Sequence, residues 1–173
     1  MTKKQQKIID IASELFSKNG YEETSTRLIA NKAGVSEGLI FRHFNNKDGL
    51  LNVLLNIGQK KLEKSINNIE SLTHPKVILK QIISLPFNVL KNQKEYWNIY
   101  YNLRWKKKIK TSNYIYRLSE MTKNAFHALD FSDPQCESDT FMMIWEGALV
   151  HVLLNDPNNS FIIYDNLLSK YSL

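Results

Sequence analysis

Hydroxyl and cationic side chains recur between residues 26 and 47, and these side chains share one chemistry. They donate hydrogen bonds to phosphate oxygens and to the edges of bases, and an arginine can donate two such bonds to one guanine. With their immediate neighbours, the residues that this spacing singles out are Thr26, Arg27, Ser36, Glu37, Gly38, Leu39, Arg42, His43 and Lys47. The pattern predicts a surface that contacts nucleic acid.

The same stretch predicts two short helices joined by a tight turn. Ser25 and the threonines beside it supply hydroxyl caps for the first helix. Gly34 supplies the turn, where a positive φ costs glycine little, and Ala30 is small enough to let the helices approach closely. The second helix runs from residue 37 to residue 43, and Ile40 plugs the angle between the two. These offsets predict a helix-turn-helix, whose second helix enters the major groove of DNA.

The second helix is expected to present four residues to solvent. They are Glu37, Gly38, Arg42 and His43. Ser36 is placed to cap this helix, Arg42 suits guanine, and Gly38 lets the backbone approach the wall of the groove. Two assignments stay open. Arg27 either reaches a phosphate or base edge or forms a surface ion pair, and Leu39 either touches a thymine methyl group or packs inside.

These residues resemble the DNA-binding domain of the tetracycline-repressor (TetR) family of bacterial transcription regulators. Over roughly residues 5 to 55, the family's pattern appears as Gly20-Tyr21, Thr24-Ser25, Ile29-Ala30, Ala33-Gly34-Val35-Ser36, Phe41, His43-Phe44, Lys47-Asp48 and Leu50. The resemblance implies a phosphate contact by Lys47. The chain departs from the pattern at Phe41, where a tyrosine hydroxyl commonly bonds a phosphate, and at Glu37, where a basic or polar residue is frequent.

The composition of the whole chain favours helices. Its 173 residues include only 6 Gly and 4 Pro, and 43% of them are hydrophobic. We expect an all-α fold of about nine helices, with a three-helix DNA-binding helix-turn-helix domain at residues 1–46. A helical effector-binding and dimerisation domain follows at residues 47–173. The fourth helix, from about residue 47 to 69, is expected to join the two without a flexible linker.

Charge and cysteine content narrow the class of protein further. The net charge of +6 is concentrated in the first two-thirds of the chain, while the last third is acidic, so the positive part suits a polyanionic partner. A single cysteine, Cys136, and the absence of a long apolar run predict a cytoplasmic protein without a membrane segment. The four histidines are scattered, and the sequence contains no metal-site, phosphate-loop or nucleophile motif. We therefore expect no metal, no cofactor and no enzymatic activity.

The last two long helices carry more apolar residues than one buried face needs. This excess predicts a homodimer held by a four-helix bundle, which would read a pseudo-palindromic operator in double-stranded DNA. The candidate interface residues are Phe141, Trp145, Ala148, Leu149, Val152, Phe161, Leu167 and Leu168. The alternative is that they fill the chain's own core.

Aromatic and methionine residues of the second domain are compatible with the small-molecule pocket that the resemblance implies. The candidates are Phe87, Trp97, Tyr100, Tyr101, Trp105, Met121, Phe126, Met142 and Met143. At helical spacing the same residues also suit a core, so this assignment stays open.

The leading interpretation is a sequence-specific transcriptional regulator, a repressor that a small-molecule effector releases from its operator. Two other interpretations stay open. One is an effector- or protein-binding helical module whose helix-turn-helix no longer reads DNA, which Glu37 and Phe41 favour. The other is an architectural DNA-binding protein without sequence preference.

Overall fold

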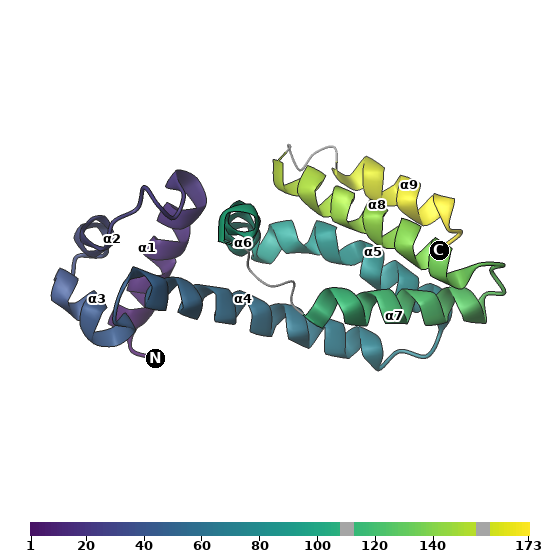
Figure 1. The fold of residues 1–173 in the computed structure, drawn as a ribbon, viewed down its shortest axis with the longest axis horizontal. Helices are drawn as coiled ribbons and strands as arrows, with labels where there is room; N and C mark the ends of the chain where they lie inside the picture. Colours follow the sequence, from purple (N-terminus) through teal and green to yellow (C-terminus); the bar gives the residue numbers. More distant parts are fainter. Residues whose placement is uncertain (108–112, 155–159) are drawn as a thin grey trace. The chain divides into compact units, whose positions relative to one another are not determined.

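The computed structural model describes residues 1–107, 113–154 and 160–173, except for the side chains of residues 89–92, 104–107 and 160 (Figure 1). Every regular element in these ranges is an α-helix, which confirms the predicted fold class. The helices are α1 (Lys3–Asn19), α2 (Thr26–Ala33), α3 (Glu37–Phe44), α4 (Lys47–Glu70), α5 (Pro75–Asn92), α6 (Lys94–Lys107), α7 (Asn113–Ala128), α8 (Pro134–Leu154) and α9 (Ser160–Lys170). No helix among the described residues is long and apolar enough to cross a membrane.

The chain divides into two compact units. We call residues 1–61 together with the α6 residues from Glu95 onward the head. We call residues 62–94 together with α7, α8 and α9 the body. Helix α4 is continuous, and it contributes its first part to the head and its last part to the body. The functional boundary between residues 46 and 47 stays a prediction.

The head is built on one apolar cluster that the first helix begins. The residues of this cluster recur at helical spacing along α1. Further members of the cluster come from α2, α3, α4 and α6. The buried members are Ile8, Ile9, Ala12, Leu15, Phe16, Tyr21, Ile29, Ala30, Ala33, Ile40, Phe44, Leu50, Leu51, Leu54, Ile99 and Leu103. Helix α6 also donates a hydrogen bond from Asn98 to the Ser17 hydroxyl over 3.2 Å. The head is therefore larger than its three N-terminal helices.

In the body, a proline inside a helix explains one buried hydrogen bond. Pro86 lies within α5 and has no N–H to donate to the Ile82 carbonyl one turn earlier. The buried indole of Trp145 on α8 donates to that carbonyl instead, over 2.7 Å. The helix therefore tolerates the proline because α8 satisfies the acceptor that the proline leaves.

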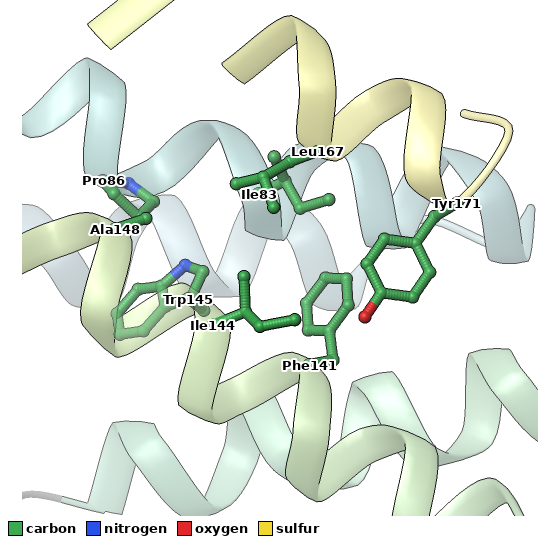
Figure 2. A pocket seen from close by; sticks show the side chains of 8 residues that line it. All are labelled: Ile83, Pro86, Phe141, Ile144, Trp145, Ala148, Leu167 and Tyr171. Carbon is green, nitrogen blue, oxygen red and sulfur yellow. The ribbon is translucent and has the colours of Figure 1, made fainter. Parts of the chain in front are cut away.

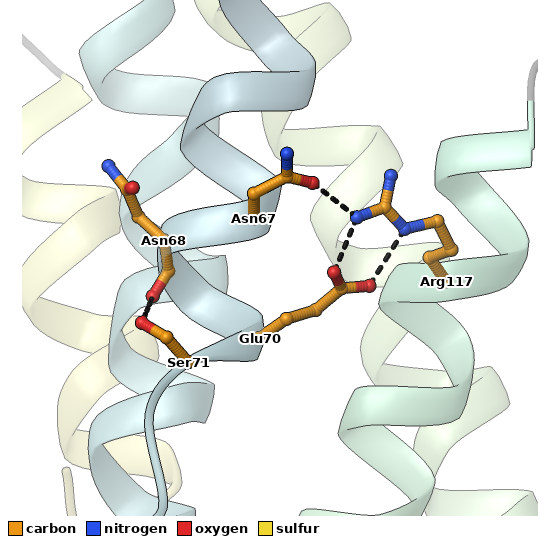
Figure 3. A network of polar contacts seen from close by, with 5 residues as sticks. All are labelled: Asn67, Asn68, Glu70, Ser71 and Arg117. Carbon is orange, nitrogen blue, oxygen red and sulfur yellow. Dashed lines mark hydrogen bonds and ion pairs between the residues drawn. The ribbon is translucent and has the colours of Figure 1, made fainter.

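An ion pair holds the end of α4 against α7 (Figure 3). The Arg117 guanidinium donates from Nε to Glu70 over 2.7 Å, from a terminal nitrogen to the second Glu70 oxygen, and to the Asn67 side chain over 2.6 Å. This fork-shaped contact lowers the pKa of the Glu70 carboxyl, chiefly through the hydrogen bond from Arg117. The last turn of α4 is thereby fixed to α7 within the body.

Candidate functional site

The turn between α2 and α3 has the geometry that the sequence predicted. The Ser25 hydroxyl caps α2 by accepting from the Leu28 amide over 3.1 Å. Gly34 ends that helix in the left-handed conformation at φ 66°, which only glycine adopts without cost. Ala30 and Ile40 are fully buried at the crossing of the helices. These local features confirm the helix-turn-helix.

Thr24 and Thr26 do not share the capping role that we predicted for the hydroxyls of this stretch. Thr24 is buried, and its hydroxyl donates to the Gly20 carbonyl over 2.8 Å, which ties the linker to the end of α1. The Thr26 hydroxyl instead donates to the Glu37 carboxylate over 2.6 Å. Ser25 alone of the three caps α2, because its position directly precedes the first helical turn.

Two of the four residues expected on the exposed face of α3 are drawn inward by neighbouring helices. Glu37 is half-buried, because its carboxylate accepts from Thr26 of α2 while lying in the first turn of α3, where the helix dipole favours an anion. His43 is half-buried, because its Nδ1 lies 3.2 Å from the side-chain amide nitrogen of Gln5 on α1. An amide nitrogen only donates hydrogen bonds, so Nδ1 is the acceptor in this contact. Both side chains brace α3 against its neighbours.

The outward face of α3 is formed by Gly38, Phe41 and Arg42, at spacings of three and four residues. A side chain added at Gly38 would meet no atom within 4 Å, so the surface there is open. Phe41 is 46% exposed and Arg42 is exposed. Sequence reasoning gave Phe41 no contact with DNA. The three-residue spacing between Gly38 and Phe41 indicates that the two residues lie on the same face of the helix.

Leu39 and Ser36 lie at the edges of this face. Leu39 is half-buried against the apolar cluster of the head, as the packing alternative predicted. Ser36 occupies the N-cap position of α3, but its hydroxyl makes no capping hydrogen bond, so our prediction of a side-chain cap is wrong. Ser36 is exposed, and its hydroxyl is available to a ligand.

Lys47 holds the linker that precedes α2. Its ammonium donates to the Tyr21 and Glu22 carbonyls over 3.0 and 3.3 Å and lies 4.3 Å from the centre of the Tyr21 ring. The Tyr21 hydroxyl donates to Asp48 over 2.6 Å. Burial raises the pKa of Tyr21 above its ordinary value, and the hydrogen bond to Asp48 adds a smaller increase. Lys47 thus has a bracing role, and its contact with a phosphate stays a prediction.

Further cations surround the helix-turn-helix. Arg27 on α2 is exposed, as are Lys32 at the end of that helix and Lys7 on α1. The Lys7 ammonium lies 3.7 Å from the place that a side chain on Gly34 would occupy, so it stands at the turn. Sequence reasoning did not assign Lys7 to the site, since only the packing of α1 beside the turn brings it there.

The candidate effector residues fall into separate places. Trp97, Tyr100 and Tyr101 pack on one another within α6 of the head, while Phe126 is fully buried in the body beside Phe141. Phe87 packs on Tyr164, and Met143 is exposed on α8. Met121 and Met142 are half-buried, and the side chain of Trp105 lies outside the described residues. None of the described candidates lines either cavity reported below.

The described residues of the body line a small cavity and a larger cleft. The first, between α5, α8 and α9, has a volume of about 10 Å³, which is space for one water molecule, and its lining is shown in Figure 2. The second is a cleft of about 300 Å³ between α4 and α5. It is lined by Ser65, Asn68, Ile69, Leu72, Val77, Gln81, Leu85 and Asn88. Only the cleft approaches the volume of small-molecule sites.

Five of the candidate interface residues lie inside the single chain. Phe141, Trp145, Ala148, Leu149 and Val152 of α8 are no more than 7% exposed. They pack in the core of the body, as the alternative interpretation stated. Leu167 and Leu168 are half-buried and Phe161 is exposed. Because helical spacing is the same for a core and an interface, the sequence alone did not separate them.

Comparison with known proteins agrees with this geometry. Residues 8–54, which lie wholly in the head, match the model of the bacterial regulatory proteins of the tetR family. The head therefore contains a segment similar to the DNA-binding domain of the TetR family. The chain is 53% identical over 49 residues to the uncharacterised helix-turn-helix regulator YvkB of Bacillus subtilis, and this match covers 28% of the chain and 26% of YvkB. It is 40% identical over 58 residues to the regulator QacR of Staphylococcus aureus, covering 34% and 31% of the two proteins.

The matched segments thus span less than a third of these relatives' own length. Solved structures match far more of the chain, at lower sequence identity. AibR in complex with isovaleryl coenzyme A and operator DNA is 17% identical with a TM-score of 0.73, and the match covers 97% of each chain. A TerR/AcrR-family regulator from Aquifex aeolicus is 19% identical with a TM-score of 0.74, covering 97% of this chain and 99% of that one. These structures share the fold.

Proposed function

We propose that the protein is a sequence-specific, DNA-binding transcriptional regulator of the cytoplasm, that it acts as a homodimeric repressor and that it has no enzymatic activity. The observation that carries this proposal is the outward face of α3. Glu37 and His43 are held inward by Thr26 and Gln5, so Gly38, Phe41 and Arg42 form an outward surface on a braced helix. Such a helix fits the major groove, where arginine distinguishes guanine from the other bases.

The cations beside α3 supply the part of binding that does not depend on sequence. Lys7 at the turn, together with Arg27 and Lys32 of α2, would contact phosphates and release counterions. The exposed Ser36 hydroxyl adds a neutral donor at the start of α3. Binding should therefore weaken as the salt concentration rises, while base preference depends on α3.

The dimer would form through the exposed apolar faces of α8 and α9. On α8, Met143 and Leu154 are 69% and 78% exposed, and a side chain added at Gly147 would meet no atom within 4 Å. On α9, Phe161 and Ile162 are exposed. Two copies of this surface can cover each other about a twofold axis, with Gly147 allowing close approach. We propose these five residues as the interface in place of the buried positions of α8.

The effector would bind in the cleft between α4 and α5. Its floor is apolar, with Ile69 and Leu85 buried, and Asn68 and Gln81 supply amide donors and acceptors at its edge. Helix α4 continues from this cleft into the head. A ligand that favours one of two positions of α4 would shift the spacing of the two recognition helices and release the operator.

Selection from a pool of random duplexes tests the proposed function. The purified protein should enrich one sequence, and the sequence should be a pseudo-palindrome because two heads bind it. Enrichment of no sequence would contradict the proposal and favour an architectural protein or a head that no longer reads DNA. A substitution in the proposed interface tests the dimer separately. Phe161→Asp should raise the dissociation constant of the dimer about a hundredfold, because the apolar contact is lost twice, and sedimentation equilibrium measures this.

A further inference from the structure

We infer that Phe41 selects a thymine in each operator half-site by packing on its methyl group, close to the guanine that Arg42 contacts. This inference rests on the proposed function. It assigns a reading role to a side chain for which the sequence predicted only a missing phosphate contact. The position of Phe41, the chemistry of its ring and the contacts of its neighbours support this role.

Phe41 lies on the exposed surface of α3. Within α3, Ile40 and Phe44 are buried in the head, whereas Phe41 is 46% exposed. A lone exposed aromatic residue needs no special explanation. Phe41, however, lies three residues after Gly38 and directly before Arg42, on the face that would enter the groove. With Glu37 and His43 held inward, Phe41 and Arg42 are the side chains that this face presents within α3.

The chemistry of the ring restricts what Phe41 can contact. A phenyl ring carries no hydrogen-bond donor for a phosphate. In the major groove the bases present polar donors and acceptors, and the one apolar group is the C5-methyl of thymine. A ring placed over a polar base edge would remove that edge from water without replacing its hydrogen bond, which is unfavourable. Burial of the methyl group against the ring is favourable.

The geometry of α3 limits where the thymine lies. Consecutive residues of a helix are separated by about 1.5 Å along its axis, and base pairs are separated by about 3.4 Å. Phe41 and Arg42 therefore reach base pairs within about two steps of each other. Gly38 lies one turn before them and adds no side chain, so the helix can approach the bases closely enough for the ring to touch a methyl group.

Replacement of single thymines by deoxyuridine tests the inference, since this change removes the methyl group and nothing else. The duplex is the operator recovered by selection, and fluorescence polarisation measures its affinity for the full-length protein. For the wild type we expect deoxyuridine at one thymine of each half-site to weaken binding about fourfold per half-site. For Phe41→Ala we expect weaker binding to the parent operator and no further loss at that thymine.

Two control variants separate reading from folding. Phe41→Tyr keeps the ring and should keep the penalty for deoxyuridine. Tyr116→Ala removes an exposed aromatic residue of the body and should leave the penalty unchanged. Circular dichroism checks that each variant is folded.

The outcomes are distinct. A specific operator whose affinity is insensitive to every thymine methyl, or a penalty that persists in Phe41→Ala, would overturn the inference and leave the proposed function standing. Failure of the wild type to prefer any sequence would overturn both.

Discussion

The head and the body of this protein differ in how closely their residues are constrained. The model of the tetR family matches residues 8–54, which all lie in the head. The solved structures match nearly the whole chain, including the body, at 17–19% sequence identity. A braced recognition helix needs particular residues at particular places, such as Gly34 in the turn and Glu37 beside Thr26. The body resembles the solved structures in the arrangement of its helices. The sequence match is therefore confined to the head, whereas the likeness of the body is one of fold.

The largest effect expected from this difference is at a head glycine. A side chain at Gly49 would lie 1.8 Å from the Phe44 carbonyl oxygen, which is backbone and cannot move aside. We expect Gly49→Ala to reduce the free energy of unfolding by about 3 kcal/mol, as measured by urea denaturation. Gly147→Ala, at an open site of the body, is the matched control. A Gly49→Ala protein as stable as the wild type would show that the head tolerates a side chain at this position.

The body has its own constraint at Trp145, and a double-mutant cycle isolates it. Trp145→Phe removes the donor to the Ile82 carbonyl and should cost about 2 kcal/mol of unfolding free energy. In a Pro86→Ala background the backbone amide gained at position 86 can satisfy that carbonyl, so the same substitution should cost about 1 kcal/mol less. Equal costs in both backgrounds would show that the indole does not substitute for the missing helix donor.

Substitutions at two glycines compare the proposed DNA-binding surface of the head with the proposed dimer surface of the body. Gly38 on α3 and Gly147 on α8 both have space for a methyl group in the single chain. Alanine at either helical site should therefore raise the unfolding free energy by about 0.5–1 kcal/mol. Gly38→Ala should nevertheless weaken operator binding about tenfold by disturbing a base contact. Gly147→Ala should weaken the dimer instead. If Gly38→Ala leaves the operator affinity unchanged, α3 does not approach the groove at this point.

A smaller effect is expected for the pH dependence of the ion pair between Glu70 and Arg117 in the body. The folded-state pKa of Glu70 is lowered, so its stabilisation is present above the unfolded pKa of about 4.3 and is lost as the pH falls through the folded value. Glu70→Gln should cost about 0.5 kcal/mol or less at pH 7, because the pair is largely solvent-exposed, and almost nothing at pH 3. Urea denaturation at the two pH values measures this. A cost that does not change with pH would contradict an ionic origin.

Glu14→Gln provides the matched comparison in the head. The pKa of Glu14 is lowered by its hydrogen bond to Lys18 within α1, but this pair joins residues of one exposed helix. We expect a smaller effect than at Glu70, whose partner lies on a different helix.

The extent to which the sequence predicted the molecule follows the same division. The turn at Gly34 and the cap at Ser25 depend on nearby residues, so their sequence signals were sufficient. The inward positions of Glu37 and His43 depend on contacts with α2 and α1, which helical spacing does not reveal. In the body, Phe126 and Trp145 are core residues, yet their pattern suits a pocket or an interface equally well. Contacts between helices that are distant in the sequence determine where these four side chains lie, and helical spacing alone does not reveal such contacts.

The most direct test of the central claim is a titration of the selected operator and a scrambled duplex by fluorescence polarisation at two salt concentrations. We expect the wild type to prefer the operator by about a thousandfold or more, and we expect both affinities to fall as the salt concentration rises. Arg42→Ala should lose about tenfold to a hundredfold of operator affinity per half-site and keep its affinity for the scrambled duplex. Equal affinity of the wild type for the two duplexes would contradict the account, as would an Arg42→Ala protein that binds the operator as tightly as the wild type.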